Sequence, residues 1–298
     1  MTQFNFGDAQ AALAFVVSQA THIEREVFDI PYPEIVYARM IPIDTSAGEF
    51  SASVTFFTQD LVGKAKLMNG AADDFPLANL VRTKFEQSVL DASIGYEFSL
   101  AEIGQAQMLG RSLSTEGAMA ARLAYEQLVD AVALAGDSGI EGLYTTTGIT
   151  STAAAAAWSG ATAAQILADV NGIISRIVAA TGGIHWPNTL VLPLAQFSLI
   201  AGKQIDATNQ TTILEFVRRS NAYTAKTGLP LEIFADVRLI NKAVCYKRDP
   251  QVLKMHIPMP LRFLPPQMVN LQVRVPGMFR FAPLSIRQPK AIQYISGM

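Results

Sequence analysis

The segment SLSTEGAMAARLAYEQLVDAVALAGD, residues 112–137, is the most strongly periodic stretch of the chain and predicts one long helix, with its main body at 114–135. Its small apolar side chains recur at three- and four-residue steps and are expected to face a core: Ala121, Ala124, Leu128, Ala131 and Ala135. Tyr125, Val129 and Val132 widen this stripe. Arg122, Glu126 and Asp130 fall on the opposite side, where solvent is expected. Ser114 and Gly136 suit the two ends as N-cap and C-terminal glycine. Tryptophan at Ala124 or Ala131 should therefore disturb folding, because a packed face has no room for it.

The composition indicates a chain that hides much of its surface in contacts with other subunits. Charged residues make up 16% of the 298 positions and hydrophobic residues 50%, whereas about 25% charged residues are usual in a soluble domain. A membrane protein is the alternative, but no run of about 18 apolar residues is present, so no spanning helix is expected. No signal peptide is expected either. The net charge of −2, without a basic cluster, does not favour nucleic-acid binding through phosphate neutralisation.

A long projection is predicted in the first third of the chain. Residues 8–24 predict an amphipathic helix in an arm that leaves the body. Residues 50–56 and 90–98 then alternate apolar and polar side chains with the period of a β-strand. About thirty residues lie between them, which is long for a compact domain unless the connection has a function. A two-stranded projection is expected, and such a ribbon is stable when it lies on a neighbouring subunit.

The second half of the chain is mixed α/β and then rich in proline. No charged residue occurs from Gly142 to Ala168, which suits a surface that folds against another without desolvating charge. Residues 162–181 predict a second amphipathic helix, and 188–193 predict a buried strand. The residues expected to face inward from this helix are Ile166, Val170, Ile173, Ile174 and Ile177. From Asp249 onward, short strands alternate with prolines, which predict edge strands and turns.

Few residues offer catalytic or metal-binding chemistry. Gly136-Asp137-Ser138-Gly139 matches the tetrapeptide around the nucleophile of trypsin-like serine proteases, but none of the three histidines has the sequence context of that family's base. An ordinary turn after the long helix is the favoured interpretation of Ser138. The single cysteine, Cys245, lies in an apolar run and is expected to be buried rather than reactive. No catalytic residue, cofactor site or metal site is predicted.

The order of these parts resembles that of the major capsid proteins of tailed bacteriophages, which have the Hong Kong 97 fold. The matching motifs are an isoleucine–proline strand at 39–43, Gly63-Lys64-Ala65-Lys66, Ala72-Asp73-Asp74-Phe75-Pro76, residues 95–102, the long helix, Gly136-Asp137 with Gly142-Leu143, Leu264-Pro265-Pro266-Gln267, and the strand at 280–289. Phe281-Ala282 stands where relatives often have a glycine pair. The similarity spans nearly the whole chain, and the order of the motifs carries it.

The resemblance implies an α+β fold with the Hong Kong 97-like architecture. Residues 1–45 would be an N-terminal arm, 46–95 an extended loop, 96–140 with 249–298 a peripheral domain around the spine helix at 114–135, and 141–248 an axial domain. The extended loop would lie over the adjacent subunit, and its candidate subunit contacts are Lys64, Lys66, Asp73, Asp74 and Phe75. Substitutions at Lys64 or Asp73 should then spare folding and impair assembly.

The function implied by the resemblance is that of a structural major capsid protein of a virion, without enzymatic activity or cofactor. Copies of the chain would assemble as pentamers and hexamers into an icosahedral head in the host cytoplasm, around double-stranded DNA bound without sequence specificity. Scaffold, portal and decoration proteins are further candidate partners, and no membrane is expected. An encapsulin-like nanocompartment shell with the same fold is the alternative, and a serine hydrolase using Ser138 is a second one.

Overall fold

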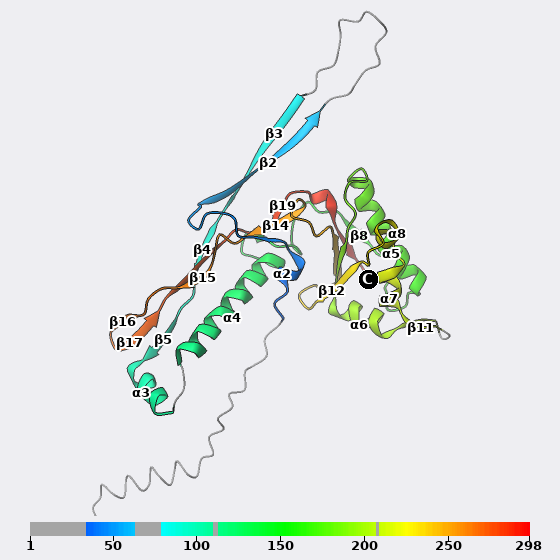
Figure 1. The fold of residues 1–298 in the computed structure, drawn as a ribbon. Coiled ribbons are helices and arrows are strands. Elements are labelled where there is room, and N and C mark those ends of the chain that lie inside the picture. The colour runs from blue at the N-terminus through cyan, green and yellow to red at the C-terminus, as the bar shows by residue number, and fades with distance from the viewer. Residues whose placement is uncertain (1–33, 63–78, 110–112, 207–208) are drawn as a thin grey trace, which may run out of the picture. The chain divides into compact units, whose positions relative to one another are not determined.

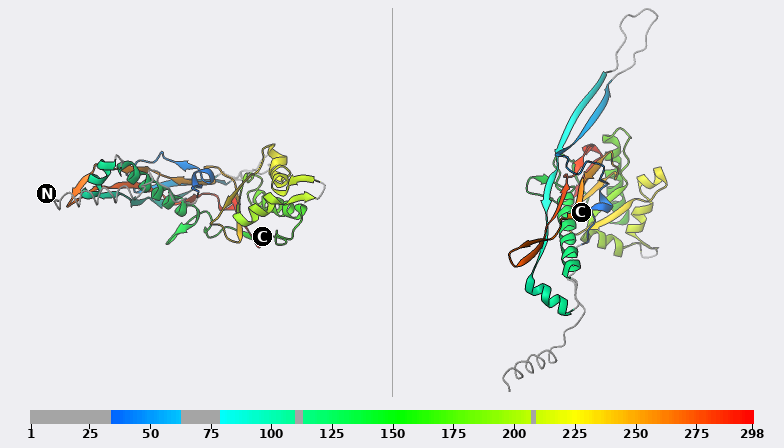
Figure 2. Two further views of the ribbon diagram at one scale, coloured as in Figure 1. Left: turned by 90° about the horizontal axis from the view of Figure 1, so that it is seen from below. Right: turned by 60° about the vertical axis from the view of Figure 1, so that its left-hand side comes forward.

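Two helices of the described chain are much longer than the others. The computed structural model describes residues 34–62, 79–109, 113–206 and 209–298, and residues 35–298 form one compact unit (Figure 1). The helices are α2 (Tyr37–Met40), α3 (Leu100–Leu109), α4 (Leu113–Leu134), α5 (Ala163–Ala180), α6 (Leu194–Gly202), α7 (Ile213–Arg219), α8 (Ala222–Thr227) and the 3-10 helix η1 (Pro289–Ala291). The long helices α4 and α5 belong to different parts of this unit (Figure 2).

The strands that accompany α5 form a five-stranded mixed sheet. They are β8 (Ser151–Ala153), β9 (Thr189–Pro193), β12 (Glu232–Asp236), β13 (Lys242–Tyr246) and β20 (Ile292–Ser296), in the order β12-β9-β13-β20-β8. β12 runs parallel to β9 and β20 parallel to β8, whereas β13 is antiparallel to both of its neighbours. All five residues of β9 are buried, which confirms the buried strand predicted at 188–193.

Three small sheets accompany α4. Their strands are β1 (Ile43–Asp44), β4 (Leu90–Ser93), β5 (Tyr96–Ser99), β14 (Leu253–His256), β15 (Met259–Phe263), β16 (Gln267–Val269), β17 (Gln272–Val275), β18 (Gly277–Phe281) and β19 (Ser285–Ile286), in the orders β1-β14-β19, β15-β18-β4 and β16-β17-β5. Each sheet joins one strand from before α4 to two strands from near the C-terminus. Backbone hydrogen bonds thus join strands from the first part of the compact unit to strands from its C-terminal part.

Three two-stranded ribbons account for the remaining strands of the described residues. β2 (Ser53–Val62) and β3 (Asn79–Ser88) form a long antiparallel ribbon at the top of Figure 1. β6 (Gly136–Asp137) pairs with β7 (Ile140–Glu141), and β10 (Gln204–Asp206) pairs with β11 (Asn209–Thr212). The strand expected at 50–56 is therefore shifted toward the C-terminus, because residues 49 and 50 form a turn.

The strand predicted at 90–98 is present, but it is divided into β4 and β5 and pairs with β18 and β17. The expected alternation is confirmed, because the apolar positions are partly buried and the positions between them are exposed: Leu90, Ala92, Ile94, Tyr96 and Phe98 against Asp91, Ser93, Gly95 and Glu97. At the division, a Cβ on Gly95 would lie 2.5 Å from the carbonyl oxygen of Val275. Only glycine allows this close approach.

Two hydrophobic clusters form the core. The α4 core contains residues from α2, α4, β14, β18 and the C-terminus, among them Met40, Tyr125, Val129, Val132, Met255, Phe279 and Phe281. The α5 core contains Trp158, the inner side of α5, and buried residues of β9, β12 and β13. Cys245 belongs to the α5 core, and burial raises the pKa of its thiol to about 12. This position confirms the prediction of a buried cysteine.

Helix α5 follows its prediction closely. Thr162 caps its N-terminus in a capping box with Gln165, and all five residues expected to face inward are buried. By length and composition alone, α5 is apolar enough to cross a membrane, although the sequence predicted no such helix. This is weak evidence for a membrane span, because the inner residues of α5 pack in the α5 core.

Helix α4 departs from its prediction. The residues buried along it are Ala121, Tyr125, Val129, Asp130, Val132, Ala133 and Leu134, whereas Leu128 and Ala131 are exposed. The prediction is confirmed for Ala121 and for the three residues that widen the stripe, but it is wrong for Leu128 and Ala131. The helix turns its larger side chains toward β18, where the rings of Tyr125 and Phe279 pack edge to face at 4.7 Å. Ser114 lies inside the helix rather than at its N-cap. Gly136 ends the run with a φ of 83°, as predicted.

The segment ahead of the ribbon also differs from expectation. Arg39 and Met40 belong to helix α2, so the strand predicted at 39–43 is reduced to β1. The sequence Ser99-Leu100-Ala101-Glu102 has the pattern of a capping box. The structure confirms it at the start of α3, since the Ser99 N–H donates to Glu102 at 2.8 Å and the Glu102 N–H donates to the Ser99 hydroxyl at 3.2 Å. The helix predicted at 8–24 lies outside the described residues.

Candidate functional site

The ribbon β2–β3 is the first candidate surface for contacts with other molecules. Its ten register pairs run from Ser53 opposite Ser88 to Val62 opposite Asn79. No third strand pairs with β2 or β3 within the part of the chain that the structure describes. A two-stranded ribbon on its own is marginally stable in water, so this one requires support from the body or from another molecule.

The base of the ribbon is supported by the body. The side-chain amide of Gln87 donates to the carbonyl oxygen of Pro283 at 2.9 Å. The guanidinium carbon of Arg287 lies 4.9 Å from the ring centroid of Phe56, and Phe56 stacks on Phe85 at 5.3 Å. These contacts hold residues 283–287, which include β19, against the ribbon. The guanidinium of Arg287 and the ring of Phe56 attract each other.

Farther from the base, the ribbon exposes large apolar side chains. Phe57 is 67% exposed, Val81 52% and Phe85 46%. Residues directly opposite each other share a face of an antiparallel pair, so Phe85 and Val81 lie on the face that Arg287 contacts, and Phe57 lies on the other face with Lys84. Exposed apolar groups gathered on one element are typical of an interaction surface.

Polar groups on the second face are joined to one another. The hydroxyl of Ser53 donates to Glu86 at 2.6 Å, and the Lys84 ammonium lies 2.9 Å from the same carboxylate. The hydrogen bond from Ser53, followed by that from Lys84, lowers the pKa of the Glu86 carboxyl. The charges near the base of this face are therefore paired, while Phe57 beside them is not covered.

The five subunit-contact residues predicted from the sequence lie outside the described residues. Lys64, Lys66, Asp73, Asp74 and Phe75 all fall between residues 63 and 78, which connect β2 to β3. They stay a prediction. The exposed residues of the ribbon itself, on either side of that connection, were not singled out from the sequence. A signal was present for Phe57 and Phe85, because each is an aromatic residue next to a run of polar residues.

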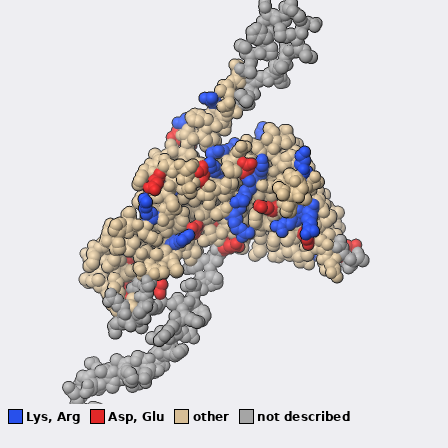
Figure 3. All heavy atoms as spheres, viewed as in Figure 1, with Lys and Arg blue, Asp and Glu red and all other residues tan. Residues whose placement is uncertain are grey.

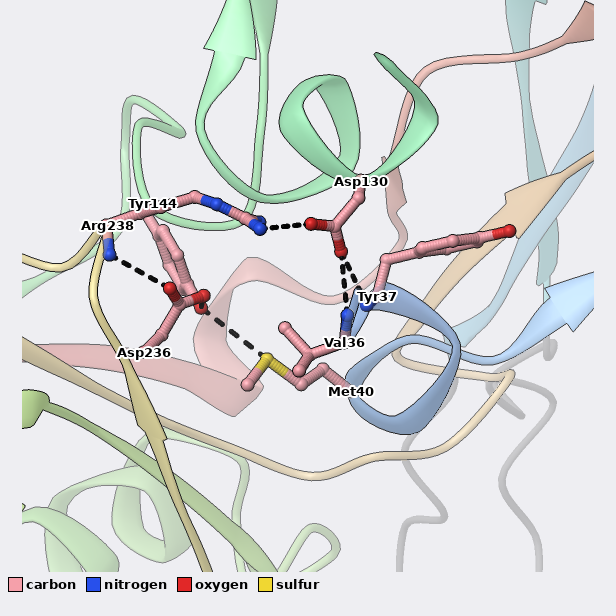
Figure 4. A network of polar contacts seen from close by, with 7 residues as sticks. All are labelled: Val36, Tyr37, Met40, Asp130, Tyr144, Asp236 and Arg238. Atoms are coloured by element: carbon pink, nitrogen blue, oxygen red, sulfur yellow. Dashed lines mark hydrogen bonds and ion pairs between the residues drawn. The ribbon is translucent and has the colours of Figure 1, made fainter. Parts of the chain in front are cut away.

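A buried polar network joins α2, α4 and the segment after β12 (Figure 4). The carboxylate of Asp130, 1% exposed, accepts hydrogen bonds from the N–H groups of Val36 at 3.0 Å and Tyr37 at 2.8 Å. It also forms an ion pair with Arg238. Asp130 was expected on the solvent side of α4, and that expectation is wrong. The helix buries this carboxylate because three donors from two other segments compensate its lost hydration.

A second carboxylate extends the network. Asp236 accepts a hydrogen bond from the Tyr144 hydroxyl at 2.6 Å and one from the Arg238 N–H at 2.9 Å. The same hydroxyl lies 3.5 Å from the Met40 sulfur. Burial, with the hydrogen bond to Asp236, raises the pKa of Tyr144 well above its usual range. The network therefore holds the N-terminal end of the compact unit, α4 and the edge strand β12 in one arrangement.

The uncharged stretch from Gly142 to Ala168 is divided between core and surface. Leu143 and Trp158 are buried, and the Trp158 indole N–H donates to Asp169 at 3.1 Å. Residues 151–153 form β8, an edge strand of the five-stranded sheet. Figure 3 shows wide uncharged areas between scattered charged side chains on the viewed face. Such areas suit contacts that desolvate little charge.

Ser138 lies in the short turn between β6 and β7. It is exposed, and its N–H donates to the Asp137 carboxylate at 2.7 Å. Among the described residues, no hydrogen bond joins Ser138 to a histidine, and both described histidines, His185 and His256, are buried. The turn supplies no base to deprotonate the serine hydroxyl, so the geometry does not support a hydrolase at this position.

Solved structures with a similar fold come from viral and virus-like shells. The capsid of Myoviridae phage XM1 matches with a TM-score of 0.80 at 15% identity, over 94% of this chain and 98% of that chain. The native GTA particle capsid matches with a TM-score of 0.63 at 12% identity, over 93% and 94%. The virus-like particle from Pyrococcus furiosus matches with a TM-score of 0.56 at 12% identity, over 87% and 91%. No curated protein matches the sequence.

The chain thus has the same fold as the proteins in these structures, and the similarity confirms the expected Hong Kong 97 fold. More particularly, the major capsid protein family matches residues 63–298. The chain belongs to this family of structural proteins and is a capsid component of a virion.

Proposed function

We propose that copies of this chain assemble as pentamers and hexamers into a closed icosahedral head that encloses double-stranded DNA. The observation that carries the proposal is the ribbon β2–β3, which exposes Phe57, Val81 and Phe85 although no third described strand supports it. An adjacent subunit lying under the ribbon would cover these side chains. Contacts of this kind, repeated around closed rings, stabilise a shell collectively even when each is weak.

The remaining regions would divide the contacts of the shell between them. The α5 region, residues 141–248 together with β20, would be the axial domain that meets its symmetry mates at the centre of each ring. The α4 region would be the peripheral domain, and the ribbon with residues 63–78 would be the extended loop. The pairing of β20 with β13 and β8 supports adding the C-terminal strand to the axial domain.

The proposed partners follow from this assembly. The head would form in the host cytoplasm, with scaffold, portal and decoration proteins as further partners, and it would hold DNA without sequence specificity. The buried network of Asp130, Asp236 and Arg238 supports a rigid connection between the two proposed domains, since its members come from α4, β12 and the segment after β12. With a rigid connection, the position of the axial domain in the ring would fix the position of the ribbon.

A nanocompartment shell that encloses protein cargo is the alternative. Its support is the similarity in fold to the virus-like particle from Pyrococcus furiosus. The contents of the particles distinguish the two functions. Nuclease-resistant double-stranded DNA in purified particles would support the phage head, whereas a stoichiometric cargo protein without DNA would support the nanocompartment.

The experiment that tests the assembly combines negative-stain microscopy with analytical ultracentrifugation of the purified full-length chain. The parent is expected to form rings or closed particles. The substitution Phe57→Asp should abolish them, because it replaces an apolar contact with a carboxylate that a neighbouring subunit could cover only by removing it from water, at a high cost in free energy. Its far-ultraviolet circular dichroism and urea midpoint should match the parent, since Phe57 is 67% exposed in the single chain.

The conservative variant Phe57→Leu provides the control, because it keeps an apolar side chain at the same position. It should assemble like the parent. Normal particles from Phe57→Asp would exclude the ribbon as an assembly contact, and a parent that stays monomeric even with its scaffold would exclude the shell. Lys64→Ala and Asp73→Ala extend the test to the connection between β2 and β3, where folding should again be spared and assembly impaired.

A further inference from the structure

The exposed apolar side chains of the α5 region gather at the two ends of one strand pair. Five large ones are exposed within residues 141–206 and 209–248: Ile184, Leu194, Leu229, Val237 and Ile240. Ile184 and Leu229 lie in the loops that lead into β9 and β12, whereas the other three follow these strands. Since β9 and β12 are neighbouring parallel strands, the first two residues lie beyond their amino ends and the other three beyond their carboxyl ends.

The carboxyl ends of β9 and β12 border an uncharged groove, here called the carboxyl-end groove. It has a volume of about 510 Å³, and none of its nine lining residues is charged. Val237 in this lining is 72% exposed and Ile240 73%. The turn that carries them is held from within, because Arg238 forms an ion pair with the buried Asp130 (Figure 4) and Leu239 is buried. The groove is therefore preformed, and little conformational entropy is lost when a partner covers it.

The amino ends carry a second apolar surface, the amino-end patch, formed by Ile184 and Leu229. Each of these residues follows a glycine of positive φ, Gly183 at 85° and Gly228 at 75°, a conformation that glycine adopts without strain. His185, directly after Ile184, is buried, so the loop is packed on the body while Ile184 faces outward. Neither the loop from α5 to β9 nor the loop from α8 to β12 contains Asp, Glu, Lys or Arg. The patch is thus as free of charge as the groove.

The two surfaces cannot cover each other within one chain. The five residues of each strand keep them apart by roughly 16 Å, at about 3.3 Å for each residue. A second copy of the chain presents the same two surfaces and can cover both, and no charge is desolvated in the contact. A contact between two different surfaces of the same chain is head to tail, and repetition of such a contact generates a ring when the rotation closes.

We infer that the amino-end patch of one copy packs into the carboxyl-end groove of the next copy around each ring. The inference rests on the proposed shell and adds the two surfaces through which neighbouring axial domains meet. Ile184 and Leu229 supply the branched side chains that enter the groove, and Leu194, Val237 and Ile240 supply its apolar border. The contact has a direction, so every copy in a closed ring uses its patch once and its groove once.

Cross-linking of the assembled full-length chain with a short bis-maleimide tests the contact. The parent should not react, because its single cysteine, Cys245, is buried. Leu229→Cys places a thiol on the patch and Val237→Cys places one at the groove. Particles that contain both variants, made by co-expression, should give a cross-linked pair with one copy of each, identified by its mass, and neither variant alone should give a pair. With both cysteines in one chain, the cross-linked ladder should end at the pentamer and hexamer.

A second pair of variants, Ile184→Cys with Ile240→Cys, repeats the test if one of the first pair fails to fold. If particles form but neither pair of co-expressed variants is cross-linked, the inference is wrong and the proposed shell stands. Pairs from Val237→Cys alone would show that two grooves face each other, which also overturns the head-to-tail contact. A parent that forms neither rings nor particles would instead remove the proposed shell, and the inference with it.

Discussion

Helices α4 and α5 are both amphipathic in sequence, yet only α5 buries every residue that its pattern places toward the core. Its inner side carries four isoleucines and a valine, all buried in the α5 core. The stripe on α4 is mostly alanine, and part of it is exposed, while Tyr125, Val129 and Val132 beside it are buried. The difference shows that the size of the side chains, rather than their spacing alone, decides which side of a helix faces the core.

The free energies involved explain this result. Burial of apolar groups contributes about 0.8 kcal/mol for each methylene, so an alanine stripe adds little to the choice between two orientations. The valines and the tyrosine of α4 add several such groups each. The carboxylate of Asp130 is also satisfied only in the observed orientation, where Arg238 and the N–H groups of Val36 and Tyr37 meet it.

The largest expected effect is the loss of that carboxylate. Asp130→Ala would leave the Arg238 guanidinium without its buried partner and two backbone N–H groups without an acceptor. We expect the free energy of unfolding of the unassembled chain to fall by about 3–5 kcal/mol, as for other broken buried ion pairs. Urea denaturation followed by circular dichroism measures it.

The control for this substitution is Asp130→Asn, which removes the charge and keeps one oxygen to accept the backbone hydrogen bonds. Asp130→Asn should lower the free energy of unfolding less than Asp130→Ala does. If Asp130→Ala lowered the free energy of unfolding by less than about 1 kcal/mol, the carboxylate would contribute no more than an exposed ion pair does. Apolar burial alone would then orient α4.

The next largest effect is expected in α5, where burial of the branched side chains should determine which side of the helix faces the core. Ile174 is fully buried, and Ile174→Ala would remove three carbon atoms and leave a cavity, at a cost of about 2–5 kcal/mol. Ile184, 73% exposed beyond the end of α5, provides the matched control, since Ile184→Ala should stay within about 0.5 kcal/mol of the parent. Equal losses from both variants would contradict the assigned inner side of α5.

Local patterns predicted much of this fold. The length of α4, the inner side of α5, the buried strand β9 and the alternation through β4 and β5 all follow from periodicities of a few residues. The capping box at Ser99 and the glycine after α4 follow from equally short signals. In each case the residues that decide the structure are neighbours in sequence.

The candidate site depended on contacts that no local pattern marks. Asp130 is 94 residues from Val36 in sequence, and its position on α4 agrees with a solvated helix face as well as with a buried one. Ile184 and Leu229 are likewise distant in sequence, although the parallel pair β9–β12 places the loops that carry them at the same end of the sheet. Short-range periodicity says nothing about which distant segment supplies a partner, so these residues could not be predicted from the sequence.

The smallest effect separates the two sides of α4 directly. Ala121 is buried and Ala131 exposed, although the alanine pattern placed both toward the core. Ala121→Trp should lower the free energy of unfolding by about 1–3 kcal/mol, because the added ring would overpack this buried position. Ala131→Trp should change it by no more than about 0.5 kcal/mol, as an exposed substitution usually does. Thermal or urea unfolding of the two variants side by side gives the comparison, and the two helical contents should be equal. If Ala131→Trp were the more damaging variant, the original alanine side would be the true inner side of α4, and the burial of Asp130 would have to be abandoned with it.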